Sequence, residues 1–182
     1  MLDGFTLTGA QANGTIVAGA GVMCDTTNLD VGGECSPTLR NLNISGNMAA
    51  GHGPGIYMQV TSGRNADPRL DHVSLTGNHT PSSNTGMLAF IDTGIGSDLS
   101  AHLTNLNFQN NKTNSSYELY YSGAQGTGNV TLDQAVFYGD KAGWGGINFS
   151  GNPQKVLTVN NTTVVSYTGF AMFTNGTVNI HN

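Results

Sequence analysis

Carboxylates are the side chains of this sequence that could hydrolyse a bond, because glycosidases use two carboxyl groups about 5 to 9.5 Å apart. Asp3, Asp71 and Asp133 occupy the same place in a repeated motif, just before a strand-like segment. The intervening copies carry Arg40 and Thr104 there, so Asp71 and Asp133 are about 10 Å apart if copies stack as strands. We interpret these aspartates as solvated turn residues, with a weak surface ion pair between Arg40 and Asp71. We predict no catalytic residues.

A second group of side chains could bind a sugar. Met23, Tyr57, Tyr120 and Asn148 are expected to face outward from another strand-like segment, and Glu118 lies beside Tyr120. Aromatic rings on a flat sheet offer an apolar face and a polar tip, which suit sugar rings. We therefore predict a ligand-binding stripe of Tyr57, Glu118, Tyr120 and Asn148. Scattered exposed aromatics, which need no functional explanation, are the alternative interpretation.

Small hydroxyl and amide side chains recur at the outward positions of the repeated strand. The first copies carry Thr6, Thr8, Asn43, Ser45, Ser74 and Thr76. Regular threonine arrays resemble ice-binding surfaces, but this array is irregular and ends in Val136 and Tyr138. Ordinary solvent-facing strands account for it, and ice binding is a minor alternative.

No motif predicts a cofactor, and we expect none. The 5 histidines form no group at metal-ligand spacing. The net charge of -5 and the 6 scattered basic residues argue against nucleic acid as a partner. The sequence has no run of about 18 apolar residues, so we predict no membrane-spanning helix.

The two cysteines, Cys24 and Cys35, lie in a stretch rich in Gly, Asp and Asn. Their spacing matches neither a zinc site nor a redox motif. They are either two buried thiols or a disulfide that closes a surface loop, and we expect the disulfide. A disulfide would imply an oxidising compartment, and therefore a secreted or cell-surface location.

Short strands must position these side chains. The chain is 37% hydrophobic and 9% charged, with 26 glycines, and β-branched and aromatic residues alternate with polar ones between turn residues. One motif recurs: an apolar residue, two mostly polar residues, and an alternating strand that ends in a small or Asn-containing turn. Its copies begin at Leu2, Leu39, Leu70, Leu103, Leu132, Val159 and Val178.

Each copy is too small to bury its apolar face alone, so the copies must stack. The sequence therefore predicts an all-β parallel β-helix of about six coils with loop insertions, in a single domain, 1–182. Two inward columns are expected to form its core. The first column holds Phe5, Leu42, Val73, Leu106, Ala135 and Thr162, and the second holds Leu7, Ile44, Leu75, Phe108, Phe137 and Val164.

The position just before the first column predicts a sharp corner. It holds Gly4, Asn41, His72, Asn105, Gln134 and Asn161. Glycine and asparagine tolerate the left-handed backbone that such a corner requires. We expect a ladder of asparagine side chains here, hydrogen-bonded from coil to coil.

On these repeats the sequence resembles the right-handed parallel β-helix superfamily, which includes pectate-lyase-like enzymes and bacterial surface proteins. Gly145-Gly146-Ile147 and Phe108-Gln109-Asn110-Asn111 are similar to motifs of polymorphic outer-membrane-protein and autotransporter-type adhesin repeats. The segments 44–47 and 75–78 are relaxed versions of the second motif. The resemblance spans nearly the whole chain and implies the fold, but the superfamily hosts lyases, hydrolases, adhesins and structural fibres.

We expect a non-catalytic extracellular or cell-surface scaffold or adhesin-like module, with a polysaccharide or a host or cell-surface ligand as its partner. A polysaccharide lyase, a glycoside hydrolase or a carbohydrate-binding domain is the alternative. The last copy breaks off after Val178 and no capping element precedes Leu2. These ends suggest a segment of a longer protein, or else a subunit that stacks end to end on its copies.

Overall fold

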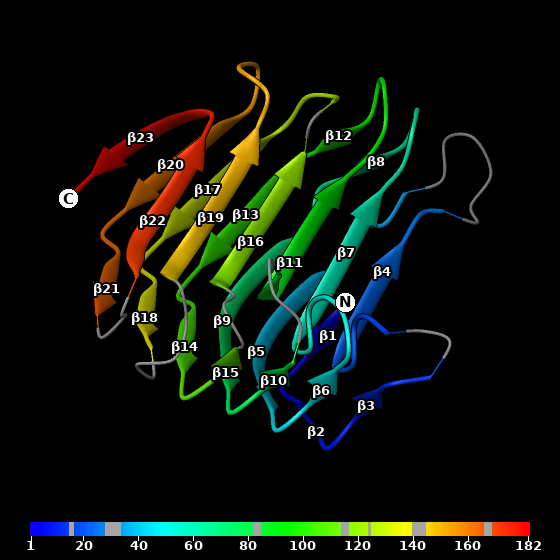
Figure 1. Ribbon diagram of the computed structural model, residues 1–182, viewed down its shortest axis with the longest axis vertical. Coiled ribbons are helices and arrows are strands. Elements are labelled where there is room, and N and C mark those ends of the chain that lie inside the picture. Colours follow the sequence, from blue (N-terminus) through cyan, green and yellow to red (C-terminus); the bar gives the residue numbers. More distant parts are fainter. Residues whose placement is uncertain are drawn as a thin grey trace.

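The computed structural model describes residues 1–14, 17–27, 34–81, 85–113, 117–123, 125–139, 145–165 and 169–182. These residues form an all-β parallel solenoid of about four turns (Figure 1). The predicted fold class is therefore confirmed. The number of turns is smaller than the six expected, because the outermost coils contribute strands to only some of the sheets. The described residues include no helix that could span a membrane.

Two sheets contain the repeated motif and the turn that follows it. Sheet A comprises β1 (Leu2–Asp3), β2 (Thr6–Thr8), β5 (Thr38–Ser45), β9 (Arg69–Thr76), β13 (Ala101–Thr104), β14 (Asn107–Gln109), β17 (Asn129–Asp133), β18 (Val136–Tyr138), β20 (Val156–Asn160), β21 (Thr163–Val165) and β23 (Thr177–His181). Sheet B comprises β3 (Gln11–Ala12), β6 (Met48–Ala49), β10 (His79–Thr80) and β15 (Lys112–Thr113).

Two further sheets complete each coil. Sheet C comprises β4 (Val22–Asp25), β7 (Ile56–Val60), β11 (Gly86–Asp92), β16 (Tyr117–Gly123), β19 (Gly145–Gly151) and β22 (Phe170–Asn175). Sheet D comprises β8 (Asn65–Ala66) and β12 (Asp98–Leu99). All strand pairs are parallel, so equivalent residues of successive coils lie side by side.

The two predicted inward columns form the core. Leu42 pairs with Val73, and Ile44 pairs with Leu75, which pairs with Phe108. The central members are buried, and the rings of Phe108 and Phe137 stack with their centroids 4.5 Å apart. Phe5, at the first coil, is the exception and is mostly exposed.

The predicted corner is left-handed in every copy. Asn41, His72, Asn105, Gln134 and Asn161 have φ angles between 46° and 54°, and Gly4 has a φ of 75°. The hydrogen bonding differs from the expected asparagine ladder, because these amides bond to aspartates. Asn41, Asn105 and Asn161 donate to Asp3, Asp71 and Asp133 of the preceding coil at 2.8, 3.1 and 3.2 Å.

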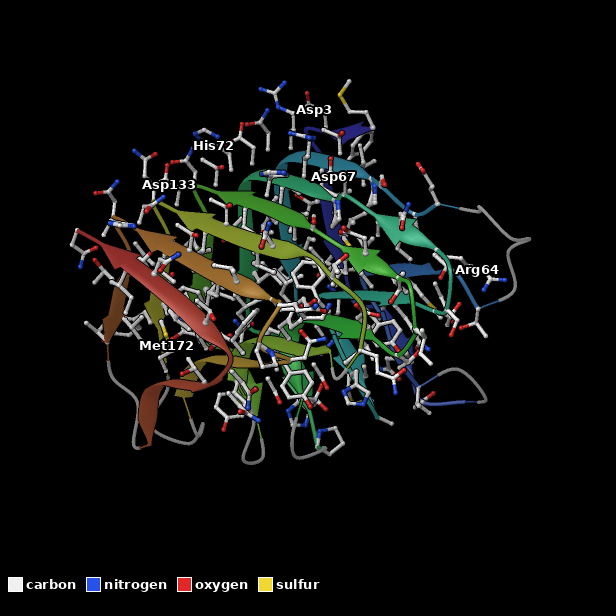
Figure 2. The ribbon with its side chains drawn as sticks, turned by 90° about the horizontal axis from the view of Figure 1, so that it is seen from above. Asp3, Arg64, Asp67, His72, Asp133 and Met172 are labelled. Atoms are coloured by element: carbon white, nitrogen blue, oxygen red, sulfur yellow. A yellow bond between two sulfur atoms is a disulfide. The ribbon has the colours of Figure 1, made fainter. Side chains whose placement is uncertain are left out.

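The three aspartates therefore stabilise the corner, but they are strand residues of sheet A directly before the left-handed position and not the turn residues interpreted from the sequence. Figure 2 shows Asp3, His72 and Asp133 along one edge of the molecule. The Asn105 hydrogen bond, followed by His72 and Arg40, lowers the pKa of Asp71. Arg40 lies 3.7 Å from Asp71 with both side chains partly exposed, so this predicted ion pair contributes little to stability.

An asparagine ladder does form, inside the solenoid and at a different position. Asn47, Asn78 and Asn111 end the repeated motif and are buried. The Nδ2 of Asn47 donates to Asn78 Oδ1 at 3.1 Å, and the Nδ2 of Asn78 donates to Asn111 Oδ1 at 3.2 Å. Each Nδ2 also donates to a backbone carbonyl, namely Leu7, Ile44 or Leu75. The ladder thus satisfies polar groups that would be costly to bury unpaired.

Gly55, directly before β7, allows sheet C to pack closely against Leu75 of the second inward column. A Cβ on Gly55 would lie 2.4 Å from Leu75 Cδ2 and 3.0 Å from the Met87 carbonyl oxygen. A side chain at this position would require Leu75 and the Met87 carbonyl to shift.

We predict that Phe108→Ala lowers the free energy of unfolding by about 2–5 kcal/mol, because it leaves a cavity in a close-packed column. The matched outer-face change, Thr76→Ala, should cost less than about 1 kcal/mol. Urea denaturation of both variants measures the difference. Equal losses would mean that the inward and outward faces have been exchanged.

Candidate functional site

The predicted aromatic stripe lies on the outer side of sheet C, where Tyr57 and Tyr120 flank Ala89 in register. His52 covers it, with its ring centroid 6.1 Å from those of both tyrosines. Its Nδ1 contacts the Thr85 hydroxyl at 2.9 Å. Tyr57 is consequently only 6% exposed, so its ring offers almost no surface to a ligand.

The other two residues of the predicted stripe are also buried. Glu118 is 2% exposed and accepts a hydrogen bond of 2.8 Å from Asn111, the last member of the internal ladder. Its carboxylate therefore faces the interior, which corrects the expected outward placement. Asn148 pairs with Tyr120 and is 8% exposed, and its Oδ1 has no hydrogen-bond partner. Of the four residues expected to face outward, Met23 is exposed and Tyr120 is partly exposed, whereas Tyr57 and Asn148 are buried.

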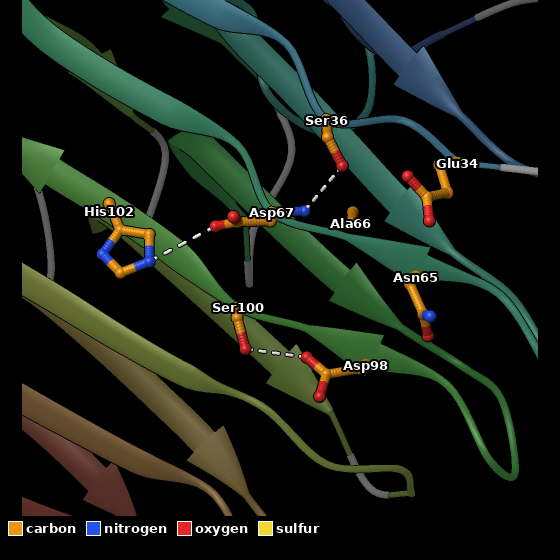
Figure 3. Close-up of a pocket in the computed structure, with 8 residues that line it drawn as sticks. All are labelled: Glu34, Ser36, Asn65, Ala66, Asp67, Asp98, Ser100 and His102. Carbon is orange, nitrogen blue, oxygen red and sulfur yellow. Dashed lines mark hydrogen bonds and ion pairs between the residues drawn. The ribbon is translucent and has the colours of Figure 1, made fainter.

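A polar pocket of about 330 Å³ lies at the sheet D side of the solenoid (Figure 3). The register of the paired strands brings its lining residues together. Asn65 pairs with Asp98 and bridges to Glu34, and four residues further along Arg69 pairs with His102. Outward side chains of three successive coils therefore meet at this place. The pocket is lined by Glu34, Ser36, Asn65, Ala66, Asp67, Asp98, Ser100 and His102.

Hydrogen bonds fix most of the polar groups of the pocket. The Ser100 hydroxyl donates to Asp98 Oδ1 at 2.7 Å, and the Thr127 hydroxyl donates to Asp98 Oδ2 at 3.2 Å. Arg69 Nη2 lies 2.7 Å from Asp67 Oδ2. The other oxygen, Asp67 Oδ1, is buried and lies 3.3 Å from His102 Nε2, in a geometry that makes no hydrogen bond.

A disulfide anchors one rim of the pocket. Cys24, at the end region of β4, is bonded to Cys35, and their Cα atoms are 6.0 Å apart. Cys35 lies between the pocket residues Glu34 and Ser36. The Ser36 hydroxyl in turn accepts a hydrogen bond of 2.9 Å from the Asp67 backbone amide. The disulfide thus ties this rim to β4, and the Ser36 hydrogen bond ties it to the neighbouring coil.

The chemistry of the pocket favours a ligand rich in hydroxyl or other hydrogen-bonding groups. Ala66 is its one apolar side chain, and it forms the buried floor. Most small-molecule pockets are lined chiefly by apolar side chains with few polar groups, so this pocket does not suit an apolar ligand. Among the described residues, no three His, Cys, Asp or Glu side chains are arranged to hold a metal ion.

Sequence reasoning missed this pocket although a signal was present. Glu34, Asp67 and Asp98 recur at nearly the spacing of the repeat, which places acids at neighbouring outward positions. The acids that share a place in the repeated motif, Asp3, Asp71 and Asp133, lie instead at the corner of sheet A.

Comparisons with known proteins identify no relative: the chain matches no family model, no curated protein and no solved structure.

Tyr57 provides a test of the covered sheet C face. Burial, together with the Asp25 carboxylate, raises its pKa to about 12. Between about pH 10 and about pH 12 the phenol is ionised in the unfolded chain but neutral in the folded chain, so rising pH favours unfolding. The contribution of Tyr57 to stability is therefore complete below its unfolded pKa of about 10 and is lost as the pH rises towards 12. We predict that the free energy of unfolding falls less steeply across that window in Tyr57→Phe than in the parent. Tyr138→Phe, which removes a half-exposed phenol, is the control. The same pH dependence in both variants would contradict the burial of Tyr57.

Proposed function

We propose that this chain is a non-catalytic extracellular or cell-surface scaffold of the adhesin type, which binds a carbohydrate in the polar pocket. The observation that carries the proposal is the convergence of outward hydroxyl, amide and carboxylate side chains from three coils on one pocket. Sugars are recognised through such hydrogen-bonding groups, and a rigid scaffold lowers the entropic cost of arranging them.

Two other observations support the location and the class of protein. The Cys24–Cys35 disulfide favours an oxidising compartment, since disulfides are rare in reducing ones. The Phe108-to-Asn111 motif resembles autotransporter-type repeats, and its asparagine belongs to the internal ladder. The pectate-lyase-like resemblance is compatible with the same solenoid, but fold alone does not specify a reaction.

The surroundings of the pocket carboxylates favour binding over hydrolysis. Both oxygens of Asp98 accept hydroxyl hydrogen bonds, and Asp67 contacts Arg69. A glycosidase requires one of its two carboxyl groups to be protonated, typically in apolar surroundings. Neither aspartate has such surroundings.

Hydrolysis is the second candidate, and a specific distance favours it. Asp67 and Asp98 come from adjacent coils and are offset by two residues, which places their Cα atoms about 8 Å apart. Side chains on Cα atoms at this separation can place their carboxyl groups about 5 to 9.5 Å apart, which is the range that glycosidases use. New reducing ends or unsaturated products after incubation with pectins, alginates and related polymers would replace the binding proposal with this one.

A carbohydrate array followed by calorimetry tests the binding proposal. We predict binding of a polysaccharide, and a loss of at least about tenfold in affinity for the double variant Asp67→Asn, Asp98→Asn, because hydrogen bonds to charged groups contribute about 1.5–3 kcal/mol. Asp133→Asn, which changes an acid at the sheet A corner, should bind as the parent does. Absence of binding, or equal affinity of the double variant and the parent, would rule out the pocket as the site.

A further inference from the structure

A lysine and an aspartate meet in the interior, away from the polar pocket. Lys155 Nζ lies 2.5 Å from Asp92 Oδ2, and both side chains are 0% exposed. The residues are 63 positions apart in the chain. Asp92 ends β11, whereas Lys155 immediately precedes β20, so the contact bridges two coils that are not adjacent.

Glycines create the path between them. Asp92 pairs with Gly123, which pairs with Gly151, so two successive coils have no side chain above the aspartate. The Lys155 side chain passes over this gap. Gly126 also borders the contact, since a Cβ there would lie 2.9 Å from Asp92 Oδ2. The surrounding backbone therefore holds the two groups together and excludes water.

The hydrogen bonds around the pair are arranged as a reaction would require. The Gly94 amide donates to Asp92 Oδ1 at 3.2 Å, and the Ser97 hydroxyl donates to the same oxygen. Two donors on one carboxyl oxygen stabilise negative charge that develops there. Besides Asp92, Lys155 Nζ donates to the Tyr121 hydroxyl at 2.7 Å and to the Thr127 carbonyl at 3.0 Å.

We propose that Lys155 and Asp92 condense to form an intramolecular isopeptide bond that links two coils of the solenoid. Two opposite charges in a water-free interior carry a desolvation penalty, and proton transfer from the ammonium to the carboxylate removes both charges. The resulting amine keeps its two remaining N–H donors for Tyr121 and Thr127. Its lone pair then faces the neutral carboxyl group of Asp92.

The step balances without a co-reactant. The Nζ lone pair attacks Asp92 Cγ, and the C=O electron pair moves to Oδ1, where the Ser97 hydroxyl and the Gly94 amide stabilise it. A second Nζ proton passes directly to the Oδ2 hydroxyl, which lies beside Nζ. Burial, followed by the Asp92 and Asp98 carboxylates, raises the pKa of Tyr121, so its phenol retains its own proton. The Cγ–Oδ2 bond breaks, one water leaves, and a Cγ–Nζ amide remains.

Proximity and stability both favour this product. Holding two reacting groups in contact corresponds to an effective concentration of about 10⁵–10⁸ M in well-oriented cases. The amide is neutral, so it replaces a buried ion pair with a group that is less costly to bury. An interior without water also protects the amide from hydrolysis.

Intact mass spectrometry of the natively purified chain, after reduction and alkylation of its cysteines, tests the proposal. The expected mass is one water lower than that of the sequence with both cysteines alkylated, and digestion should yield one branched peptide that joins the segments containing Asp92 and Lys155. Lys155→Met should restore the full sequence mass. Lys112→Met, which removes an exposed lysine, should keep the loss of water.

Two results would overturn the proposal. One is a parent chain of full mass whose Lys155 amine is acylated under denaturing conditions, which would show an ion pair only. The other is a loss of water that maps elsewhere, such as to a cyclic imide at Asp3-Gly4. Both readouts use the parent chain and do not depend on the folding of a variant.

Discussion

The left-handed residue at the sheet A corner is the constraint on which the rest of the solenoid depends. In each coil the residue at this corner has a positive φ, at Gly4, Asn41, His72, Asn105, Gln134 and Asn161. A left-handed non-glycine residue costs about 1–2 kcal/mol, so the chain accepts this cost five times to turn at the same place. Every strand that follows the corner then begins in the same register as the strand of the coil beside it.

Register in turn produces the chemistry of the molecule. Inward positions stack into columns, and the asparagines that end the motif stack into an internal ladder that reaches Glu118. Outward positions stack in the same way, and at the sheet D side they bring carboxylates from three coils to one pocket. The contact between Asp92 and Lys155 also follows from register, because the stacked glycines leave the path open. The pocket and the Asp92–Lys155 contact each arise only when coils align.

The sequence was sufficient to predict the structural features that repeat from coil to coil. The alternation around Leu42, Ile44 and Phe108 predicted the columns, and the recurrence of Asn, Gly and His before them predicted the left-handed corner. Hydrogen-bond partners were less predictable: Asn105 was expected to bond to its counterparts, but its amide donates to Asp71. Simple alternation along β16 predicts that Glu118 faces outward, as Tyr120 does. The strands on either side have Met87 or glycine at this level, and the Glu118 side chain turns inward instead. No local sequence pattern predicts the contact of Lys155 with Asp92, because it depends on how two separate coils stack.

Gln134 offers the most direct test of the corner constraint, because it is exposed and has a φ of 54°. Glycine adopts this conformation without steric cost, whereas a β-branched residue is strained there. Chemical denaturation should show that Gln134→Gly is at least as stable as the parent and that Gln134→Val is less stable by about 1–2 kcal/mol. If Gln134→Val is as stable as the parent and Gln134→Gly is clearly less stable, the corner does not require a left-handed residue, and this account of the coil register is contradicted.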